Sequence, residues 1–232
     1  LFFIRESSDG LRIGAMTRQR TVERSPFVQR RAPLIHETMP HIAHPQIRNR
    51  GTFGGSLAHA DPASELPVLA VTLDARMRVQ SSRGERWIAA RDFYLDLFAT
   101  DLQPDELLVE IAIPDLPART GWAFDEVARR HGDYAMAGAA ATVTLAADGT
   151  IETARLVYLS VGDFPTKAFQ AEAVLTGEQP TPAVIRAAAE TAAVQDIAPG
   201  SDIHASAEYR RHLAKVLAGR VLTRAVERAR ER

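Results

Sequence analysis

The chain has 232 residues, a formal net charge of −1 and no cysteine. Hydrophobic residues make up 46% of it and charged residues 25%, a composition typical of a globular protein with a sizeable core. The balanced charge gives no reason to expect nucleic acid as a partner, and no apolar run approaches the roughly 18 residues that a membrane span needs. Without cysteine the chain cannot ligate an iron–sulfur cluster, so a redox centre would come from a bound cofactor or a partner chain.

The first forty residues predict a hairpin followed by short helices. The apolar runs Phe2–Arg5 and Leu11–Ala15 flank a Ser-Ser-Asp-Gly turn and are typical of paired strands. Thr17 is a suitable N-cap for a short helix. Residues 27–39 then carry a helical pattern of apolar positions, which Pro33 interrupts.

The stretch from Ile47 to Pro67, here called the glycine run, holds the densest set of chemically distinctive residues. Pro40 and Pro45 predict an irregular passage into it. Glycine pairs let the backbone turn sharply and let an anion approach the amide groups, while hydroxyl and guanidinium groups add donors. We therefore predict a loop that cradles a phosphorylated cofactor, with a plain tight turn as the alternative. The polar and glycine residues of the run are Arg48, Asn49, Arg50, Gly51, Thr52, Gly54, Gly55, Ser56, His59, Asp61, Ser64 and Glu65.

Beyond the glycine run the periodicity changes from helical to alternating. We predict a helix at Ser64–Leu73 with Asp61 as its cap. Two prolines and a glycine within residues 114–121 mark a linker, which divides the chain into a domain of residues 1–116 and a domain of residues 117–232. The other elements predicted before the linker are a hairpin of Arg76–Ser81 with Arg86–Ile88, a short helix at Arg91–Phe98 and a half-buried strand at Leu107–Ile113.

After the linker, short strands give way to helices, which predicts a second, antiparallel sheet covered by helices and an α+β class for the whole chain. The strands are expected at Trp122–Val127, Ala137–Leu145 and Ile151–Val161, and the helices at Thr166–Leu175, Pro182–Gln195 and Ser206–Glu231.

Three motifs in this order resemble the FAD-binding medium subunit of the molybdenum hydroxylases, the family of carbon monoxide dehydrogenase and xanthine dehydrogenase. The first is Gln46-Ile-Arg-Asn-Arg-Gly-Thr-Phe-Gly-Gly-Ser56 running into Asp61-Pro-Ala-Ser-Glu-Leu-Pro67. The second is Asp105-Glu-Leu-Leu-Val-Glu-Ile-Ala-Ile-Pro114. The third is Gly132-Asp-Tyr-Ala135 together with the segment from Ser201 to Arg210. The resemblance implies an FAD-binding PCMH-type (vanillyl-alcohol-oxidase-like) domain followed by a carbon monoxide dehydrogenase flavoprotein C-terminal domain.

The resemblance also implies which residues contact FAD. Glu65 would hydrogen-bond a sugar or ribityl hydroxyl, and Ile42 would press on the adenine. Leu108 would lie near the flavin ring, and Tyr134 would sit over or beside the isoalloxazine. The residues implied at the diphosphate, with the phenylalanine among them, are Thr52, Phe53, Gly54, Gly55 and Ser56.

The chain departs from the family pattern in three places. Position 56 is commonly Asn or Asp and position 65 commonly Asp, whereas this chain has Ser56 and Glu65, which keep a polar group. Family members also carry an N-terminal subdomain with an Ala-Gly-Gly-x-Ser-Leu loop, which this sequence lacks. Because the chain opens on Leu1-Phe-Phe-Ile4 without an initiator Met, we interpret it as the FAD domain without that subdomain, with half of the diphosphate clamp absent.

Other side chains are weaker candidates for a metal site or for catalysis. His36 and His41 do not have the spacing of a helical zinc pair, and we predict no metal site. Asp61 and Glu65 lie four residues apart and could form an acid/base pair, but capping by Asp61 is the simpler interpretation. We predict no catalytic residue in this chain. The basic run Arg129-Arg130-His131 is either a solvated turn or a surface facing the flavin or a neighbouring subunit.

Three functional hypotheses follow from the resemblance. In the first, the chain is an electron-transfer subunit of the cytoplasm whose FAD takes electrons from a [2Fe–2S] small subunit and passes them to an external acceptor. A large subunit with molybdopterin would complete the complex, as a dimer of heterotrimers. In the second, the chain is a truncated paralogue without flavin that serves as an assembly or scaffold module. In the third, it is another FAD enzyme of the same fold acting alone, such as a reductase.

Overall fold

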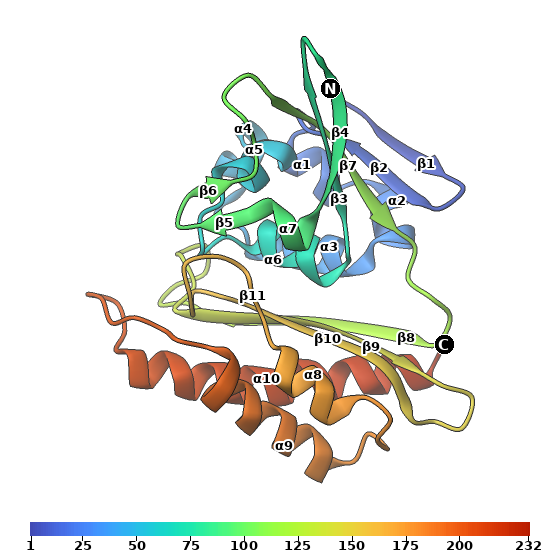
Figure 1. Ribbon diagram of the computed structural model, residues 1–232, viewed down its shortest axis with the longest axis vertical. Helices are drawn as coiled ribbons and strands as arrows, with labels where there is room; N and C mark the ends of the chain where they lie inside the picture. Colours follow the sequence, from blue (N-terminus) through green and yellow to red (C-terminus); the bar gives the residue numbers. More distant parts are fainter.

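The computed structural model describes residues 1–232 and shows two antiparallel sheets with helices between them and outside them (Figure 1). The first half of the chain builds the larger sheet and the second half the smaller one. This arrangement confirms the predicted α+β class. No helix in the structure is both long enough and apolar enough to cross a membrane.

The larger sheet has five strands, and β7 lies at its centre. Leu107–Pro114 alternates between faces, so its inward side chains belong to the core, as the sequence pattern predicts. Both predicted hairpins are confirmed. The strand order is β1 (Ile4–Ser7), β2 (Gly10–Gly14), β7 (Leu107–Pro114), β3 (Arg76–Ser81) and β4 (Gly84–Ala89).

Short helices of the first half pack between this sheet and the second one (Figure 1). A small ribbon of two strands, β5 (Tyr94–Asp96) and β6 (Ala99–Thr100), follows the last of them. The helices are α1 (Gln19–Glu23), α2 (Pro26–Arg31), α3 (Pro33–Thr38), the 3-10 turn η1 (Met39–His41), α4 (Pro45–Arg50), α5 (Phe53–His59), α6 (Glu65–Thr72) and α7 (Ala90–Phe93).

Three local predictions in this half, outside the glycine run, are wrong. Thr17 caps no helix, because its buried hydroxyl bonds to the backbone N–H and C=O of Phe3 at 3.1 and 3.0 Å. Pro45 begins helix α4 instead of an irregular passage, since the first turn of a helix tolerates proline. The helix predicted at residues 91–98 ends at Phe93, where the chain enters β5.

The smaller sheet is formed by the second half and confirms the strands predicted there. Its order is β11 (Thr166–Lys167), β10 (Ile151–Leu159), β9 (Ala137–Leu145) and β8 (Thr120–Val127). The helices that follow are α8 (Phe169–Leu175), α9 (Pro182–Thr191), the π-helical turn η2 (Ala192–Asp196) and α10 (Ala207–Arg230).

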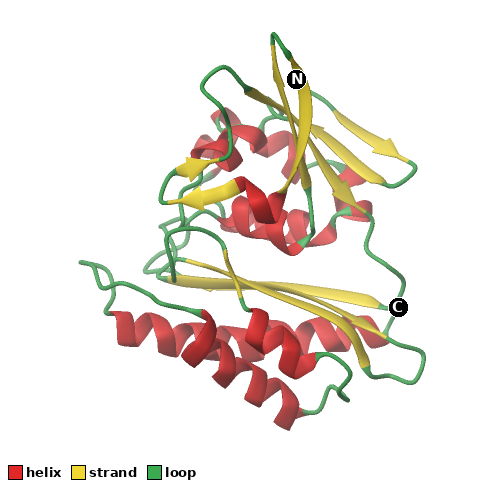
Figure 2. Cartoon of the chain, viewed as in Figure 1, coloured by secondary structure: helices red, strands yellow, loops and turns green.

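Both faces of this smaller sheet are covered (Figure 2). Helix α10 lies against β8 and β9 on the outer face, and α3 and α6 of the first half pack on the inner face. Close approach of α10 requires small residues: a Cβ on Gly121 would lie 1.9 Å from the carbonyl oxygen of Ala225. On the inner face, Phe124, Val157 and Leu159 join the core of the first half. The two halves therefore share one buried boundary.

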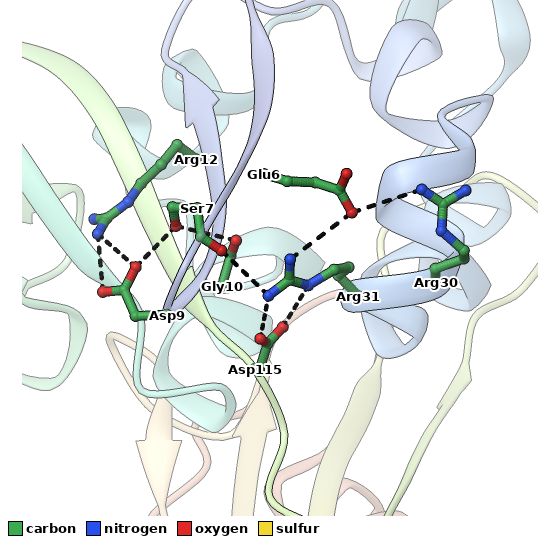
Figure 3. Close-up of polar contacts among 8 residues, drawn as sticks. All are labelled: Glu6, Ser7, Asp9, Gly10, Arg12, Arg30, Arg31 and Asp115. Atoms are coloured by element: carbon green, nitrogen blue, oxygen red, sulfur yellow. Dashed lines mark hydrogen bonds and ion pairs between the residues drawn. The ribbon is translucent and has the colours of Figure 1, made fainter.

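Arg31 anchors the segment that leaves β7 toward the second sheet (Figure 3). Its Nε donates to Oδ1 of Asp115 at 2.8 Å, and its Nη2 donates to the carbonyl oxygen of Ser7 at 3.3 Å. Glu6 lies 3.8 Å from another nitrogen of the same guanidinium. Helix α2, the β1–β2 hairpin and the connection between the sheets thus meet at one side chain.

Candidate functional site

The glycine run covers the end of α4, the whole of α5 and the first turn of α6, and its glycines lie at and just before the start of α5, which corrects the predicted loop. Thr52 is the N-cap, and its Oγ1 accepts a hydrogen bond from the N–H of Gly55 at 3.1 Å. The N–H of Phe53 donates to the carbonyl oxygen of Thr17 at 2.8 Å, and that of Gly54 donates to Ala15 at 2.9 Å. The first amide groups of the helix are therefore bonded within the chain.

Close packing explains the glycine at position 54. A Cβ there would lie 2.5 Å from the Cβ of Ala15 and 2.8 Å from its carbonyl oxygen, so α5 could not rest on the end of β2. Gly55, in contrast, is exposed. The hydroxyl hydrogen of Thr52 remains free to donate, and the hydroxyl of Ser56 makes no hydrogen bond within the chain. These three residues present the polar surface of the helix start.

The two arginines of the run differ in their surroundings. Arg48 is buried, pairs with Glu23 at 2.9 Å and donates to the carbonyl oxygen of Ile42 at 2.7 Å. It is not free to bind an anion. Arg50 is exposed, and its carbonyl oxygen accepts a hydrogen bond from the exposed Arg18. The free cations beside the start of α5 are therefore Arg18 and Arg50.

The apolar residues that the resemblance implies lie in one core. Ile42, Phe53 and Leu108 are all buried and belong to the same cluster of packed side chains. Phe53 is 1% exposed, so it supports the helix start from below. Leu108 lies on β7, opposite Val79 of β3.

Glu65 begins helix α6 and is 8% exposed, with no side-chain partner. Burial raises the pKa of its carboxyl to about 7, and the charge of Glu126 adds to that rise. The prediction that Asp61 caps this helix is wrong. Its Oδ1 instead accepts a hydrogen bond from the N–H of Ala63 in the preceding turn, at 2.8 Å. Ser64 occupies the N-cap position.

Glu126 was not predicted as a site residue; it lies on β8, in the second half of the chain. The Nδ1 of His41 lies 3.4 Å from its Oε1, and the His41 ring meets the edge of Phe124 with 5.2 Å between ring centroids. This contact raises the pKa of His41. A signal was present: Phe124 and Glu126 alternate onto the inner face of β8, where a charged residue needs a partner.

Tyr134 lies in the connection between β8 and β9 and is 72% exposed. Partial burial raises the pKa of its hydroxyl, and the charges of Asp61 and Glu65 add to the rise, so the three side chains face a common region. Tyr134 and Asp61 line a cleft of about 970 Å³ between the two halves. Other residues of this cleft are Arg129, Asp133, Asp163, Asp202 and Arg210.

Arg210 of helix α10 fixes the far wall of the cleft. Its Nη1 donates to the carbonyl oxygen of Met136 at 2.6 Å, and its Nη2 donates to Asp202 at 2.6 Å. N–H groups of His204 and Ala205 also bond to Asp202, at 2.8 and 3.0 Å. These bonds lower the pKa of Asp202 to about 2. The motifs around Tyr134 and Arg210, which the resemblance singled out far apart in the sequence, therefore line the same cleft.

The candidate residues form two separate groups, and no hydrogen bond or ion pair connects one group with the other. The hydroxyls of Thr52 and Ser56 lie at the start of α5, while Glu65 and Tyr134 face the region beside the cleft. Hydroxyl donors and exposed guanidinium groups suit a diphosphate, and an exposed aromatic ring suits a flavin. Glu65, a buried polar side chain without a partner, suits a sugar hydroxyl. The residues present fit FAD.

Two family descriptions match this chain and together cover most of it. Residues 1–116 match the FAD binding domain in molybdopterin dehydrogenase, and residues 122–225 match the CO dehydrogenase flavoprotein C-terminal domain. The chain therefore belongs to the FAD-binding medium subunits of the molybdenum hydroxylases, which are oxidoreductase subunits. This confirms the resemblance derived from the three motifs.

Individual relatives match along nearly the whole chain. The 6-hydroxypseudooxynicotine dehydrogenase complex subunit alpha of Paenarthrobacter nicotinovorans is 44% identical over 98% of this chain and 76% of the relative. The carbon monoxide dehydrogenase medium chain of Afipia carboxidovorans is 40% identical over 99% and 77%. Among solved structures, carbon monoxide dehydrogenase from Hydrogenophaga pseudoflava superposes with a TM-score of 0.94 at 36% identity, covering 98% of this chain and 78% of that one.

Proposed function

We propose that this chain binds FAD along the surface from the start of α5 to Tyr134 and passes electrons from a [2Fe–2S] subunit to an external acceptor. The observation that supports it most is the match of both halves, in order, to the two parts of the flavoprotein family. We also propose that the two domains divide between residues 116 and 117. This point lies in the connection after β7, just beyond Asp115, to which Arg31 donates a hydrogen bond.

When bound, FAD supplies the redox chemistry, and this chain supplies binding and orientation. In the proposal, the hydroxyls of Thr52 and Ser56 donate to the diphosphate beside the exposed Gly55. The carboxyl of Glu65 bonds a hydroxyl of the sugar or ribityl chain. The ring of Tyr134 covers the isoalloxazine and excludes water from that face.

The remaining implied residues act through packing. Ile42 and Leu108 form an apolar floor for the adenine and the flavin ring, while Phe53 and Gly54 hold helix α5 against the end of β2. Glu65, Tyr134 and His41, whose pKa values are raised, form no nucleophile–base pair, and we assign no catalytic residue to this chain.

The partners in this proposal are an iron–sulfur small subunit and a molybdopterin large subunit, arranged as a dimer of heterotrimers in the cytoplasm. The test is co-purification of the full-length protein with its partners. We expect a flavin absorbance band that bleaches on reduction and one FAD for each copy of this chain. A colourless complex with all three subunits would contradict the proposal.

A flavin-free scaffold is the second candidate, and one observation favours it. The N–H groups of Phe53 and Gly54 are already bonded to Thr17 and Ala15, so the start of α5 offers a diphosphate few backbone donors. Titration of the flavin-depleted complex with FAD separates the two. Saturable binding with recovery of the absorbance band supports the electron-transfer role, and an intact complex that never takes up FAD supports the scaffold.

A further inference from the structure

Ser160 lies directly after β10 and lines the cleft between the two halves. Its N–H donates to the carbonyl oxygen of Pro62, in the turn before α6, at 2.9 Å. Its hydroxyl donates to the carbonyl oxygen of Ala135, in the connection between β8 and β9, at 2.7 Å. Its own carbonyl oxygen accepts from Nη1 of Arg210, on α10, at 3.1 Å. The three polar groups of Ser160 therefore bond to three different walls of the cleft.

The backbone of Ser160 is in the left-handed region, with a φ of 60°. Serine adopts this conformation at a cost, because its Cβ comes close to backbone oxygen, and glycine would adopt it more easily. Glycine, however, has no hydroxyl to donate to Ala135. A strained residue persists only where its surroundings hold it, and here three hydrogen bonds do so. The strain therefore points to a role for the hydroxyl.

The bonds of Ser160 and Arg210 meet on the connection that carries Tyr134. Tyr134 is 72% exposed, whereas Ala135, the next residue, is 4% exposed and packs in the core of the first half. The carbonyl oxygen of Met136, the residue after that, accepts from Nη1 of Arg210 at 2.6 Å. Two successive carbonyl groups after Tyr134 are thus held by neighbouring elements, and the place of the exposed ring depends on them.

We propose that Ser160 is a positioning residue, whose hydroxyl and N–H hold the connection carrying Tyr134 against the turn before α6. In this way Ser160 fixes where the Tyr134 ring stands in the cleft. Because Pro62 belongs to the first half and Ala135 to the second, the same residue also sets the spacing of the two halves at the cleft. That the ring covers a flavin there rests on the function proposed above.

The first test measures hydrogen–deuterium exchange in the flavin-depleted complex. In Ser160→Ala we expect faster exchange across residues 128–136, including the N–H of Met136, which donates to Val127 at 2.8 Å. Thr223→Ala is the control, because the hydroxyl of Thr223 also donates to a carbonyl oxygen at 2.7 Å, on α10 and away from the cleft. It should leave residues 128–136 unchanged. Native exchange there in Ser160→Ala would overturn the proposal.

Ser160→Gly keeps the test decisive if the alanine variant fails to fold. Glycine removes the same hydroxyl but relieves the left-handed backbone. We expect the same faster exchange across residues 128–136, because the bond to Ala135 is lost in both variants. If Ser160→Gly exchanges like the native protein, the backbone conformation alone holds the connection, and the role of the hydroxyl is refuted.

The second test uses the complete complex and measures the reduction potential of its FAD in a double-mutant cycle. Tyr134→Leu should raise the potential, because water that reaches the ring stabilises the negative charge of the reduced form. Ser160→Ala should shift it in the same direction, and should add nothing in the Tyr134→Leu background. Additive shifts would show that Ser160 does not act through Tyr134. If the complex proves to hold no flavin, the proposed function fails, and the exchange test alone decides the role of Ser160.

Discussion

The Nε of Arg48 lies 2.9 Å from Oε2 of Glu23, and the side chain of Arg48 is buried while that of Glu23 is half-buried. Arg20 also donates to Glu23, at 2.7 Å. Burial opposes ionisation of Glu23, yet the hydrogen bonds from Arg48 and Arg20 hold its pKa below the ordinary value. Since Arg48 also bonds the carbonyl oxygen of Ile42, one guanidinium fixes α4, α1 and the approach to the proposed adenine floor.

Replacing Arg48 by Met should destabilise the protein strongly. The change leaves Arg20 as the remaining partner of Glu23 and the carbonyl oxygen of Ile42 without its donor, and a buried polar group that loses its partner costs about 1–3 kcal/mol. Urea unfolding followed by circular dichroism measures the loss. Arg83→Met is the control, because Arg83 and its partner Asp105 are exposed and their removal should change little. Equal effects of the two changes would contradict this account of Arg48.

Most of the fold could be predicted from the sequence, because local periodicity and tertiary burial agree there. Leu107–Ile113 alternates and forms the central strand, and the strands predicted at Ala137–Leu145 and Ile151–Val161 form β9 and β10. The start of α5 could not be predicted in this way. The glycines predicted a loop. In the structure, the first N–H groups of the helix donate hydrogen bonds to the carbonyl oxygens of Ala15 and Thr17, which lie far earlier in the chain, and these bonds hold the start of the helix in place.

The candidate site was predictable in composition but not in geometry. The motifs named Glu65 and Tyr134, and the structure places both beside the boundary between the halves. Glu126 was missed because its partner, His41, lies on another element and is brought to it only by folding. A charged residue on the inward face of a strand is the signal that sequence reading can use for such a group.

Gly54→Ala should destabilise the protein by about 1–3 kcal/mol, because the new Cβ would overlap Ala15 where α5 packs on the end of β2. Gly219→Ala is the matched control. Gly219 lies in the interior of α10, and a Cβ there meets nothing within 4 Å, so alanine should stabilise the helix by about 0.5–1 kcal/mol. Thermal unfolding of both variants checks these opposite signs. A neutral Gly54→Ala would show that α5 can shift without cost.

Acid should loosen the far wall of the cleft through Asp202. Its pKa is lowered to about 2 by the N–H of Ala205 and by Arg210, compared with 3.8 ordinarily. A lowered pKa adds stability that is fully present above pH 3.8 and is lost as the pH falls toward 2. Asp202→Asn should therefore flatten the dependence of unfolding free energy on pH in this window. Asp163→Asn, exposed in the same cleft and unpaired, should leave the slope as it is.

Thr52→Ala separates the structural role of the glycine run from its role in binding. The change removes the N-cap of α5, at a cost of about 1 kcal/mol, and a hydroxyl donor of the proposed diphosphate site. Thr181→Ala is matched to it, because Thr181 caps α9 in the same geometry, with its Oγ1 accepting from Val184 at 3.2 Å, on a helix outside the proposed site. We expect similar losses of stability in both variants.

Flavin content of the purified complexes then gives the decisive comparison. Thr52→Ala should retain clearly less FAD than the native complex, while Thr181→Ala should retain as much, because only Thr52 faces the proposed cofactor. Thr52→Ser should restore both stability and FAD, since serine supplies the same cap and the same donor. If both alanine variants lose FAD to the same extent, the loss follows stability, and the hydroxyl of Thr52 has no direct part in binding.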